Sequence, residues 1–175
     1  MMEDLSLHIL DIAENAVTAG ASRVLVAVNE NERRDRLAFR VTDNGRGMSA
    51  EERTRALDPF FTTGRKRTGL GLPLLAQTAE LCNGRLAIRP RPGGGTMVAA
   101  AFPFFHVDRP PLTKMAETMM TLIFGHPEVA FGYRHTRNGF RFSILWPGGK
   151  GGTGPARILA VRHSLKAGLA RIGAS

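Results

Sequence analysis

The chain has 175 residues, enough for one domain with an appendage, and its 43% hydrophobic content is typical of a globular protein. It has no apolar run long enough to span a bilayer and no basic-then-apolar start like that of a signal peptide, so we expect a cytoplasmic protein with no transmembrane segment. The single cysteine, Cys82, excludes an intramolecular disulfide and a metal site built from cysteines.

The formal charge of +9 is spread unevenly along the chain. Residues 104–175 hold 10 Lys and Arg against 3 Asp and Glu, whereas residues 1–103 hold 14 against 12. A basic excess of this kind is found in proteins that bind nucleic acid, anionic lipid or an acidic protein. Because the basic residues are scattered and no nucleic-acid motif accompanies them, we do not expect nucleic-acid binding.

The first hundred residues predict a helix, two strands, a short helix, a loop, a second helix and two more strands. Apolar residues spaced three or four apart indicate a helix over 4–19, and alternation indicates strands at 23–29 and 37–43. Ser49 with Glu52 forms a capping-box pattern at the start of a short helix over 50–57. A loop at 59–70, a helix at 72–82 and strands at 85–90 and 96–102 follow. This order predicts an α+β two-layer sandwich, with helices on one face of a mixed sheet.

After Pro103 the pattern predicts a C-terminal extension of one helix, two strands and a last helix. The helix lies within 109–125, the strands surround an Asn138-Gly139 hairpin turn, and a Gly-rich linker precedes a basic amphipathic helix over 156–173. We therefore expect three segments: 1–103, 104–147 and 148–175.

The stretch "FRVTDNGRGM", residues 39–48, suggests a buried carboxylate. Phe39 and Val41 lie on the apolar face of the predicted strand, and Asp43 continues that face. A carboxylate placed there needs a donor, because burial penalises its charged form. Asp-Asn-Gly is also ordinary turn chemistry, so an exposed Asp in a hairpin corner remains the alternative.

Two further segments carry residues suited to a phosphate ligand. His8, Asp11, Asn15 and Thr18 form a polar stripe on the first helix, where an Asn oxygen suits Mg²⁺ and a carboxylate suits activation of water; a solvated helix face is the alternative. Glu14 lies on a different flank, and we expect it to be an exposed charge. The "TGLGL" stretch, residues 68–72, places Gly69 and Gly71 where a basic loop enters a helix, a position suited to phosphate oxygens. Arg65, Lys66 and Arg67 of that loop could close over the anion.

Taken in order, these motifs resemble the ATP-binding domain shared by histidine kinases, type II topoisomerases, heat-shock chaperones and mismatch-repair ATPases, the GHKL or Bergerat fold. "DIAENAVTAGAS" is similar to its Asn box, "DNGRGM" to its first glycine box, "DPFFTTGRKRTGLGL" to its phenylalanine box, lid and second glycine box, and "GGGTMVAAAF" to its closing box. The resemblance covers about residues 4–103 and is strongest to the catalytic domain of histidine kinases.

The resemblance implies ATP and Mg²⁺ as ligands and assigns roles to residues. Asn15 would coordinate the Mg²⁺ that bridges the triphosphate, and Asp43 would accept a hydrogen bond from the adenine amino group, with a water held by Thr96. Asp11 takes the position of a general-base glutamate, one methylene shorter. The adenine pocket would be shaped by Gly45, Gly47 and Met48, and the phosphate side lined by Gly69, Leu70, Gly71 and Leu72.

Two functions are compatible with these features. In the first, the chain is an enzyme that phosphorylates a partner protein in trans or hydrolyses ATP slowly. In the second, it is an ATP-sensing regulatory module with little turnover, like an anti-sigma factor or a conformational switch. No helical hairpin with a phosphoacceptor His precedes the first helix, so we do not expect a complete autophosphorylating sensor, and we expect His8 to be structural. The basic extension is suited to docking a protein partner; extra core is the alternative.

Overall fold

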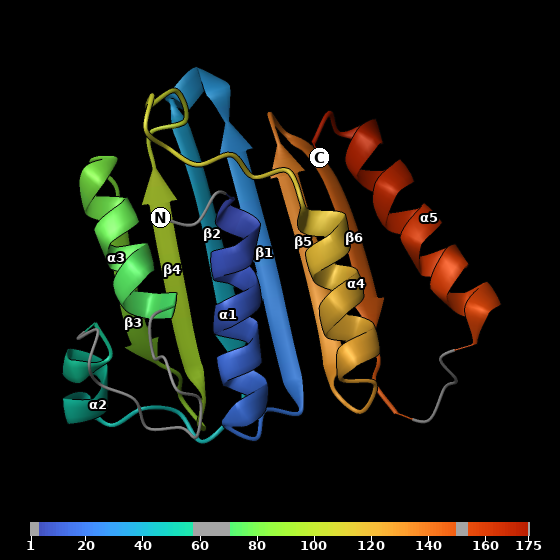
Figure 1. Cartoon of the computed structure of the whole chain (residues 1–175), viewed down its shortest axis with the longest axis horizontal. Helices are drawn as coiled ribbons and strands as arrows, with labels where there is room; N and C mark the ends of the chain where they lie inside the picture. The colour runs from blue at the N-terminus through green and yellow to red at the C-terminus, as the bar shows by residue number, and fades with distance from the viewer. Residues whose placement is uncertain (1–3, 58–70, 150–153, 175) are drawn as a thin grey trace.

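The computed structural model describes residues 4–57, 71–149 and 154–174 (Figure 1). In chain order the elements are α1 (Leu5–Thr18), β1 (Arg23–Asn31), η1 (Glu32–Arg34), β2 (Arg36–Asp43), α2 (Ala50–Arg55), α3 (Gly71–Leu81), β3 (Arg85–Pro90), β4 (Thr96–Phe102), α4 (Met115–Gly125), β5 (Ala130–Arg137), β6 (Phe140–Trp146) and α5 (Pro155–Arg171). No helix within these ranges is both long and apolar enough to cross a membrane.

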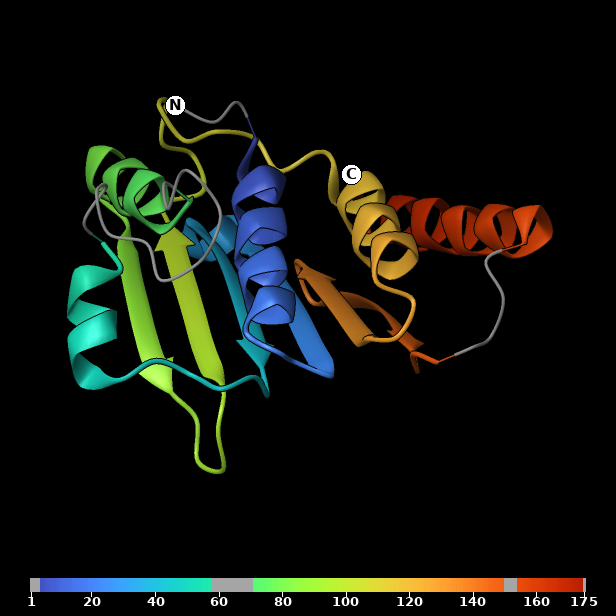
Figure 2. The same ribbon diagram turned by 60° about the horizontal axis from the view of Figure 1, so that its bottom comes forward.

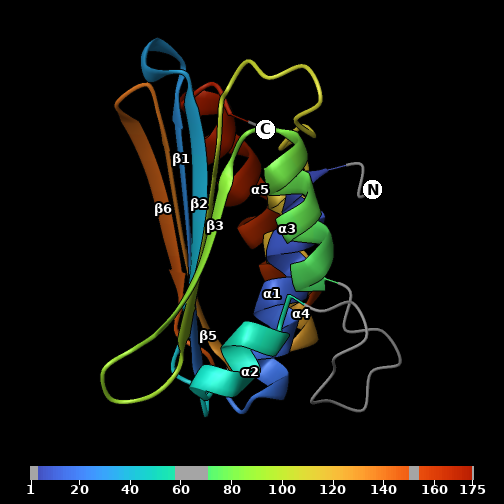
Figure 3. The ribbon, with the colours of Figure 1, turned by 90° about the vertical axis from the view of Figure 1, so that its left-hand side faces the viewer.

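The strands form one six-stranded sheet in the order β3-β4-β2-β1-β5-β6. The pair β1–β5 is parallel and the other four pairs are antiparallel, so the sheet is mixed. The helices α1 to α5 lie on the same side of it (Figure 3), where alternate strand residues such as Val26 and Val41 are buried. The predicted two-layer α+β sandwich is confirmed.

The C-terminal extension continues the sheet of the first hundred residues. β5 pairs with β1, with Val26 opposite Tyr133, and α4 packs beside α1. α5 buries Leu165 and Leu169, and Gly168 allows it to contact the Phe142 ring of β6. The expected helix, hairpin and last helix are all present, as Figure 2 also shows. The division at 103 and 147 stays a prediction.

β1 runs to Asn31, two residues beyond the predicted end, because buried polar groups hold it in the sheet. Glu30 points into the helix layer, where its Oε1 lies 2.7 Å from Nε2 of His135. The other ring nitrogen of His135 hydrogen-bonds the Tyr133 hydroxyl at 2.6 Å, and burial raises the pKa of that hydroxyl well above its ordinary value. These residues lie about a hundred positions apart, so the pattern around residue 30 alone indicated only a polar loop.

α4 begins at Met115, later than the start of the apolar pattern, because the preceding segment is tied to the beginning of α1. The Leu5 N–H donates to the Pro111 carbonyl oxygen at 2.8 Å. Asp4, the N-cap of α1, accepts from Ser6 N at 2.8 Å through Oδ1 and from both N and Oγ1 of Thr113 through Oδ2. One carboxylate thus caps a helix and holds the connection to the extension.

Removing this carboxylate should destabilise the protein in a pH-dependent way. Burial alone would raise the pKa of Asp4, but the hydrogen bonds from Ser6 and Thr113 outweigh it and hold the pKa below its ordinary value of 3.8. The stabilisation is therefore present at neutral pH and lost as the pH falls below about 3.8. Asp4→Ala should lower the free energy of unfolding by ~1–2 kcal/mol at neutral pH, as loss of an N-cap does.

Urea unfolding of the wild type and of Asp4→Ala at neutral and acidic pH tests this expectation. The difference between them should shrink in acid, because the wild-type carboxylate becomes protonated. Glu80→Ala, at an exposed position of α3, is the control and should change little at either pH. A difference for Asp4→Ala that stays constant with pH would contradict the role of the charge.

Candidate nucleotide-binding site

Asp43 is the last residue of β2, and its side chain is buried, with 8% of the residue exposed. Its Oδ1 accepts a hydrogen bond from Gly45 N at 2.8 Å, so the Asp-Asn-Gly turn does form, but with the carboxylate inside rather than in solvent. The inward placement predicted from strand alternation is confirmed. Within the described part of the chain no donor meets Oδ2, which is left as an acceptor for a ligand.

Glycines allow the turn after Asp43 to fit between α1 and the β3–β4 connection. A Cβ on Gly45 would lie 2.9 Å from the Ala19 carbonyl oxygen, and one on Gly47, whose φ is +76°, would lie 3.1 Å from the Gly95 oxygen. A Cβ on Gly95 would overlap the carbonyl oxygen of Asp43 itself. Two of these positions also need a positive φ, which L residues rarely adopt.

Thr96 and Met48 complete this side of the site. The antiparallel register that pairs Thr42 with Met97 brings Thr96, the first residue of β4, beside Asp43. Both side chains are buried on the helix side of the sheet. Met48 is half-buried against the core just before α2, whose predicted capping box between Ser49 and Glu52 is present.

The polar stripe of α1 forms the second wall. Asp11 is half-buried and Asn15 is exposed. Gly71 begins α3 directly against Asp11, because a Cβ on Gly71 would lie 3.1 Å from Asp11 Oδ2. Leu72 is buried and anchors this end of α3 to the core. The N-terminus of α3 therefore opens beside the carboxylate of α1.

His8, one turn before Asp11, is fully buried and does not belong to a solvated helix face. Burial lowers the pKa of its imidazole, so the ring is neutral at physiological pH. The Gly71 backbone offsets part of this shift, although neither ring nitrogen of His8 has a hydrogen-bond partner within the described residues. The expected structural role agrees with this placement.

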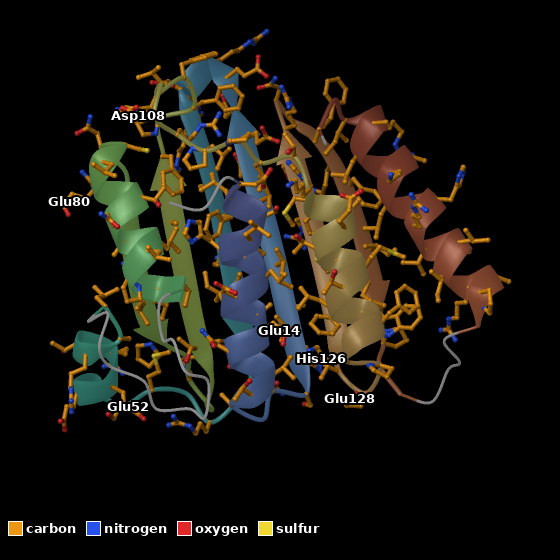
Figure 4. All side chains as sticks on the ribbon, viewed as in Figure 1. Glu14, Glu52, Glu80, Asp108, His126 and Glu128 are labelled. Carbon is orange, nitrogen blue, oxygen red and sulfur yellow. The ribbon has the colours of Figure 1, made fainter. Side chains whose placement is uncertain are left out.

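Glu14 was expected to be an exposed charge on another flank of α1, and this expectation is wrong. Its carboxylate is half-buried, and both oxygens lie 3.0 Å from Nε2 of His126, at the end of α4. Figure 4 shows the two side chains pointing toward one another from α1 and the α4–β5 connection. This pairing could not be predicted from the sequence, because His126 lies 112 residues away and no local pattern connects it to α1.

Several residues proposed for the phosphate side lie outside the described residues, namely Arg65, Lys66, Arg67, Gly69 and Leu70. Their roles stay predictions. Across the ranges 4–57, 71–149 and 154–174, no group of three or more His, Cys, Asp and Glu side chains could hold a metal ion by itself.

Comparison with known proteins assigns the family. Residues 3–106 match the model of the histidine kinase-, DNA gyrase B- and HSP90-like ATPases, which is more than half of the chain, and the chain belongs to this family. It therefore contains a histidine-kinase-like ATP-binding domain.

Two relatives are sensor proteins of Pseudomonas aeruginosa. The sensor protein kinase FleS is 36% identical over 109 residues, covering 62% of this chain and 27% of FleS. The alginate biosynthesis sensor protein KinB is 33% identical over 87 residues, covering 49% of this chain and 15% of KinB. The chain thus matches only a minor part of the length of these proteins.

Two solved structures share the fold. The ATPase domain of Aquifex aeolicus MutL, complexed with ADP, superposes with a TM-score of 0.59 and 16% identity, covering 95% of this chain and 70% of that one. The N-terminal domain of a DNA repair protein gives a TM-score of 0.59 with 13% identity, covering 82% of this chain and 52% of that one. The superposition on the MutL domain includes most of the residues after 103, so that structure also shares the arrangement of the extension.

The close approach of the β3–β4 connection to the Asp43 backbone can be tested with two glycines of that connection. Gly93 and Gly95 both have positive φ, +81° and +92°, but a Cβ on Gly93 would meet nothing within 4 Å. Both Ala variants should lose about 1–2 kcal/mol for the left-handed backbone. Gly95→Ala should lose a further ~1–3 kcal/mol, because its methyl group forces the Asp43 backbone to move.

Urea unfolding of the two variants measures this difference. Equal losses for Gly93→Ala and Gly95→Ala would show that the close approach of the two backbones does not constrain the turn.

Proposed function

We propose that the chain binds Mg-ATP at the site between α1, the β2 turn and the start of α3, and uses it to phosphorylate a partner protein in trans or to hydrolyse it slowly. The proposal depends chiefly on the arrangement of Asp43. It is a buried carboxylate with one oxygen held by Gly45 and the other left for a ligand, in a domain of an ATPase family.

The adenine base would bind beside Asp43. The free Oδ2 can accept the hydrogen bond that the exocyclic amino group of adenine donates, and the buried Thr96 hydroxyl beside it can hold a bridging water. Gly45, Gly47 and Met48 would border the base, since the two glycines bring backbone rather than side chains to this wall.

The triphosphate would extend toward the start of α3. The first turn of a helix has N–H groups without partners inside the helix, and Gly71 and Leu72 are the described residues there. Arg65, Lys66, Gly69 and Leu70 are proposed to complete this wall from the lid segment.

A magnesium ion fits the residues present if it arrives with the nucleotide. Mg²⁺ in such sites takes one or two protein oxygens, and phosphates and water supply the rest. Asn15 is exposed on the same side of α1 as Asp11 and can offer its amide oxygen.

Asp11 is proposed as the general base. It lies four residues before Asn15, hence on the same helix face, and next to the N-terminus of α3 where the phosphates would bind. Its carboxylate would orient and deprotonate the attacking water or acceptor group. A protein partner, in the cytoplasm, would be engaged through the basic extension.

The nucleotide contacts predict separable losses of affinity. Asp43→Asn keeps an acceptor for Gly45 but offers adenine an amide N–H where it needs an acceptor. We expect Mg-ATP affinity measured by calorimetry to fall about 100-fold, ~2.8 kcal/mol, with less preference for ATP over GTP. Asn15→Ala should weaken Mg-ATP about tenfold and leave metal-free ATP unchanged. Asp35→Asn, exposed between β1 and β2, is the control. Unchanged affinity in both site variants would exclude the site.

Catalysis is tested separately with [γ-³²P]ATP and Mg²⁺. Asp11→Asn should bind ATP within about twofold of the wild type while phosphate release or transfer falls about 100-fold, the usual size of general-base catalysis. Glu14→Gln, on the same helix but facing His126, should keep turnover. Undiminished turnover in Asp11→Asn would remove the base assignment. If the wild type binds ATP yet gives neither release nor transfer, the chain is an ATP-sensing module instead.

A further inference from the structure

The face of the sheet opposite the helices is not covered by any described element, as the edge-on view shows (Figure 3). We call it the open sheet face. The strand registers align its residues in rows, of which the central one crosses all six strands. This row consists of Ala87, Ala99, Arg40, Ala27, Arg134 and Ser143.

The open sheet face carries positive charge without compensation. It presents seven exposed arginines, Arg23, Arg36, Arg40, Arg85, Arg89, Arg134 and Arg141. The two carboxylates within the described strands, Glu30 and Asp43, both point into the helix layer instead. Between the arginines the face is built mainly of alanine and other small residues, so its surface is low and flat.

One border of this face adds apolar surface and a cavity. Leu25 and Leu145 are 43% and 70% exposed and flank Gly132, over which the Leu25 side chain lies. Beside them, a cavity of about 180 Å³ is lined by Arg23, Arg91 and the β3–β4 connection. Arg91 also donates to the Asp43 carbonyl oxygen at 2.8 Å, so the cavity backs onto the turn of the nucleotide site.

The chemistry of the open sheet face favours an acidic protein over other partners. A second copy would bring arginine against arginine. Proteins that bind single-stranded nucleic acid stack bases on aromatic side chains, and the open sheet face has none among its strand residues. Reading a duplex needs an element that enters a groove, which a flat sheet lacks. Arginine is enriched in protein interfaces, and a face of unpaired arginines is electrostatically complementary to the carboxylates of an acidic protein.

The size of the face also suits a protein partner. Six strands spaced about 4.8 Å apart and six to nine residues long give roughly 24 by 25 Å, about 600 Å². This area approaches the ~800 Å² that each partner contributes to a standard interface.

We propose that the open sheet face is the docking surface for an acidic protein partner, and that a carboxylate of the partner enters the cavity between Arg23 and Arg91. The proposal rests on the proposed function for the existence of a partner, and it places the docking surface on the sheet, to which the extension contributes β5 and β6, rather than on the extension alone. Two of the seven arginines, Arg134 and Arg141, come from the extension, so both halves of the chain build the surface.

Charge reversal on the two sides of the molecule tests the proposal. The open-face variant is Arg40→Glu with Arg134→Glu, and the matched control is Lys114→Glu with Arg162→Glu, two exposed positions in the helix layer with the same change of net charge. The probes are a fluorescein-labelled acidic peptide of Glu with interspersed Leu and a labelled DNA duplex of equal charge. Fluorescence anisotropy gives their affinities over a series of salt concentrations.

We expect the peptide to bind the wild type and the control within about twofold, and the open-face variant at least about tenfold more weakly. Binding should weaken with salt. No peptide binding, or equal losses in both variants, would overturn the proposal, and tighter binding of DNA would assign the face to nucleic acid. Mg-ATP affinity, measured in parallel, should be unchanged in both variants, so failure of the docking proposal is distinguishable from failure of the nucleotide site.

Discussion

A carboxylate held inside the end of a strand constrains most of the structure around the candidate site. Asp43 is tolerated in the core because Gly45 donates to one of its oxygens. That bond requires a turn so tight that its backbone touches the end of α1 on one side and Gly95 on the other. The buried carboxylate is thus accompanied by glycines in two loops, Gly45 and Gly47 in its own turn and Gly95 in the β3–β4 connection.

α1 links the candidate site to the C-terminal extension, because neighbouring residues of this helix face each of them. Asn15 faces the candidate site, while Glu14, the preceding residue, is paired with His126 of the extension. At the other end of the helix, Asp4 holds Thr113. The helix that would contact the phosphates is therefore fastened at both ends to the segment after Pro103, and the extension helps to set its position.

The local elements and much of the candidate site could be predicted from the sequence, because their signals are local. Alternation placed Asp43 inside, and Ser49 with Glu52 predicted the capping box. The interactions that remained hidden join residues far apart in the chain. Glu30 looked like part of a polar loop because its partner His135 lies in another segment, and Glu14 looked exposed because His126 was not known to be near it.

The arrangement of strands was hidden for the same reason. The pattern predicted β5 and β6 but not that β5 would lie parallel to β1. Without that pairing the arginines of the extension could not be placed beside those of β1 and β2. The basic excess of the extension is visible in the sequence, but only the strand order shows that Arg134 and Arg141 join five arginines of the first 103 residues on one face.

The parallel pairing of β5 with β1 also affects how readily the molecule can associate with other copies through its strand edges. A chain cut after Pro103 would leave β1 as a long edge strand with unpaired N–H and C=O groups, and would uncover the flank of α1 that α4 protects. Such edges are templates for pairing between molecules, and proteins usually shield them. The hairpin of β5 and β6 moves the edge outward to a strand whose buried side is covered by α5. In this sense the extension shields the β1 edge and the flank of α1 that the first hundred residues alone would expose.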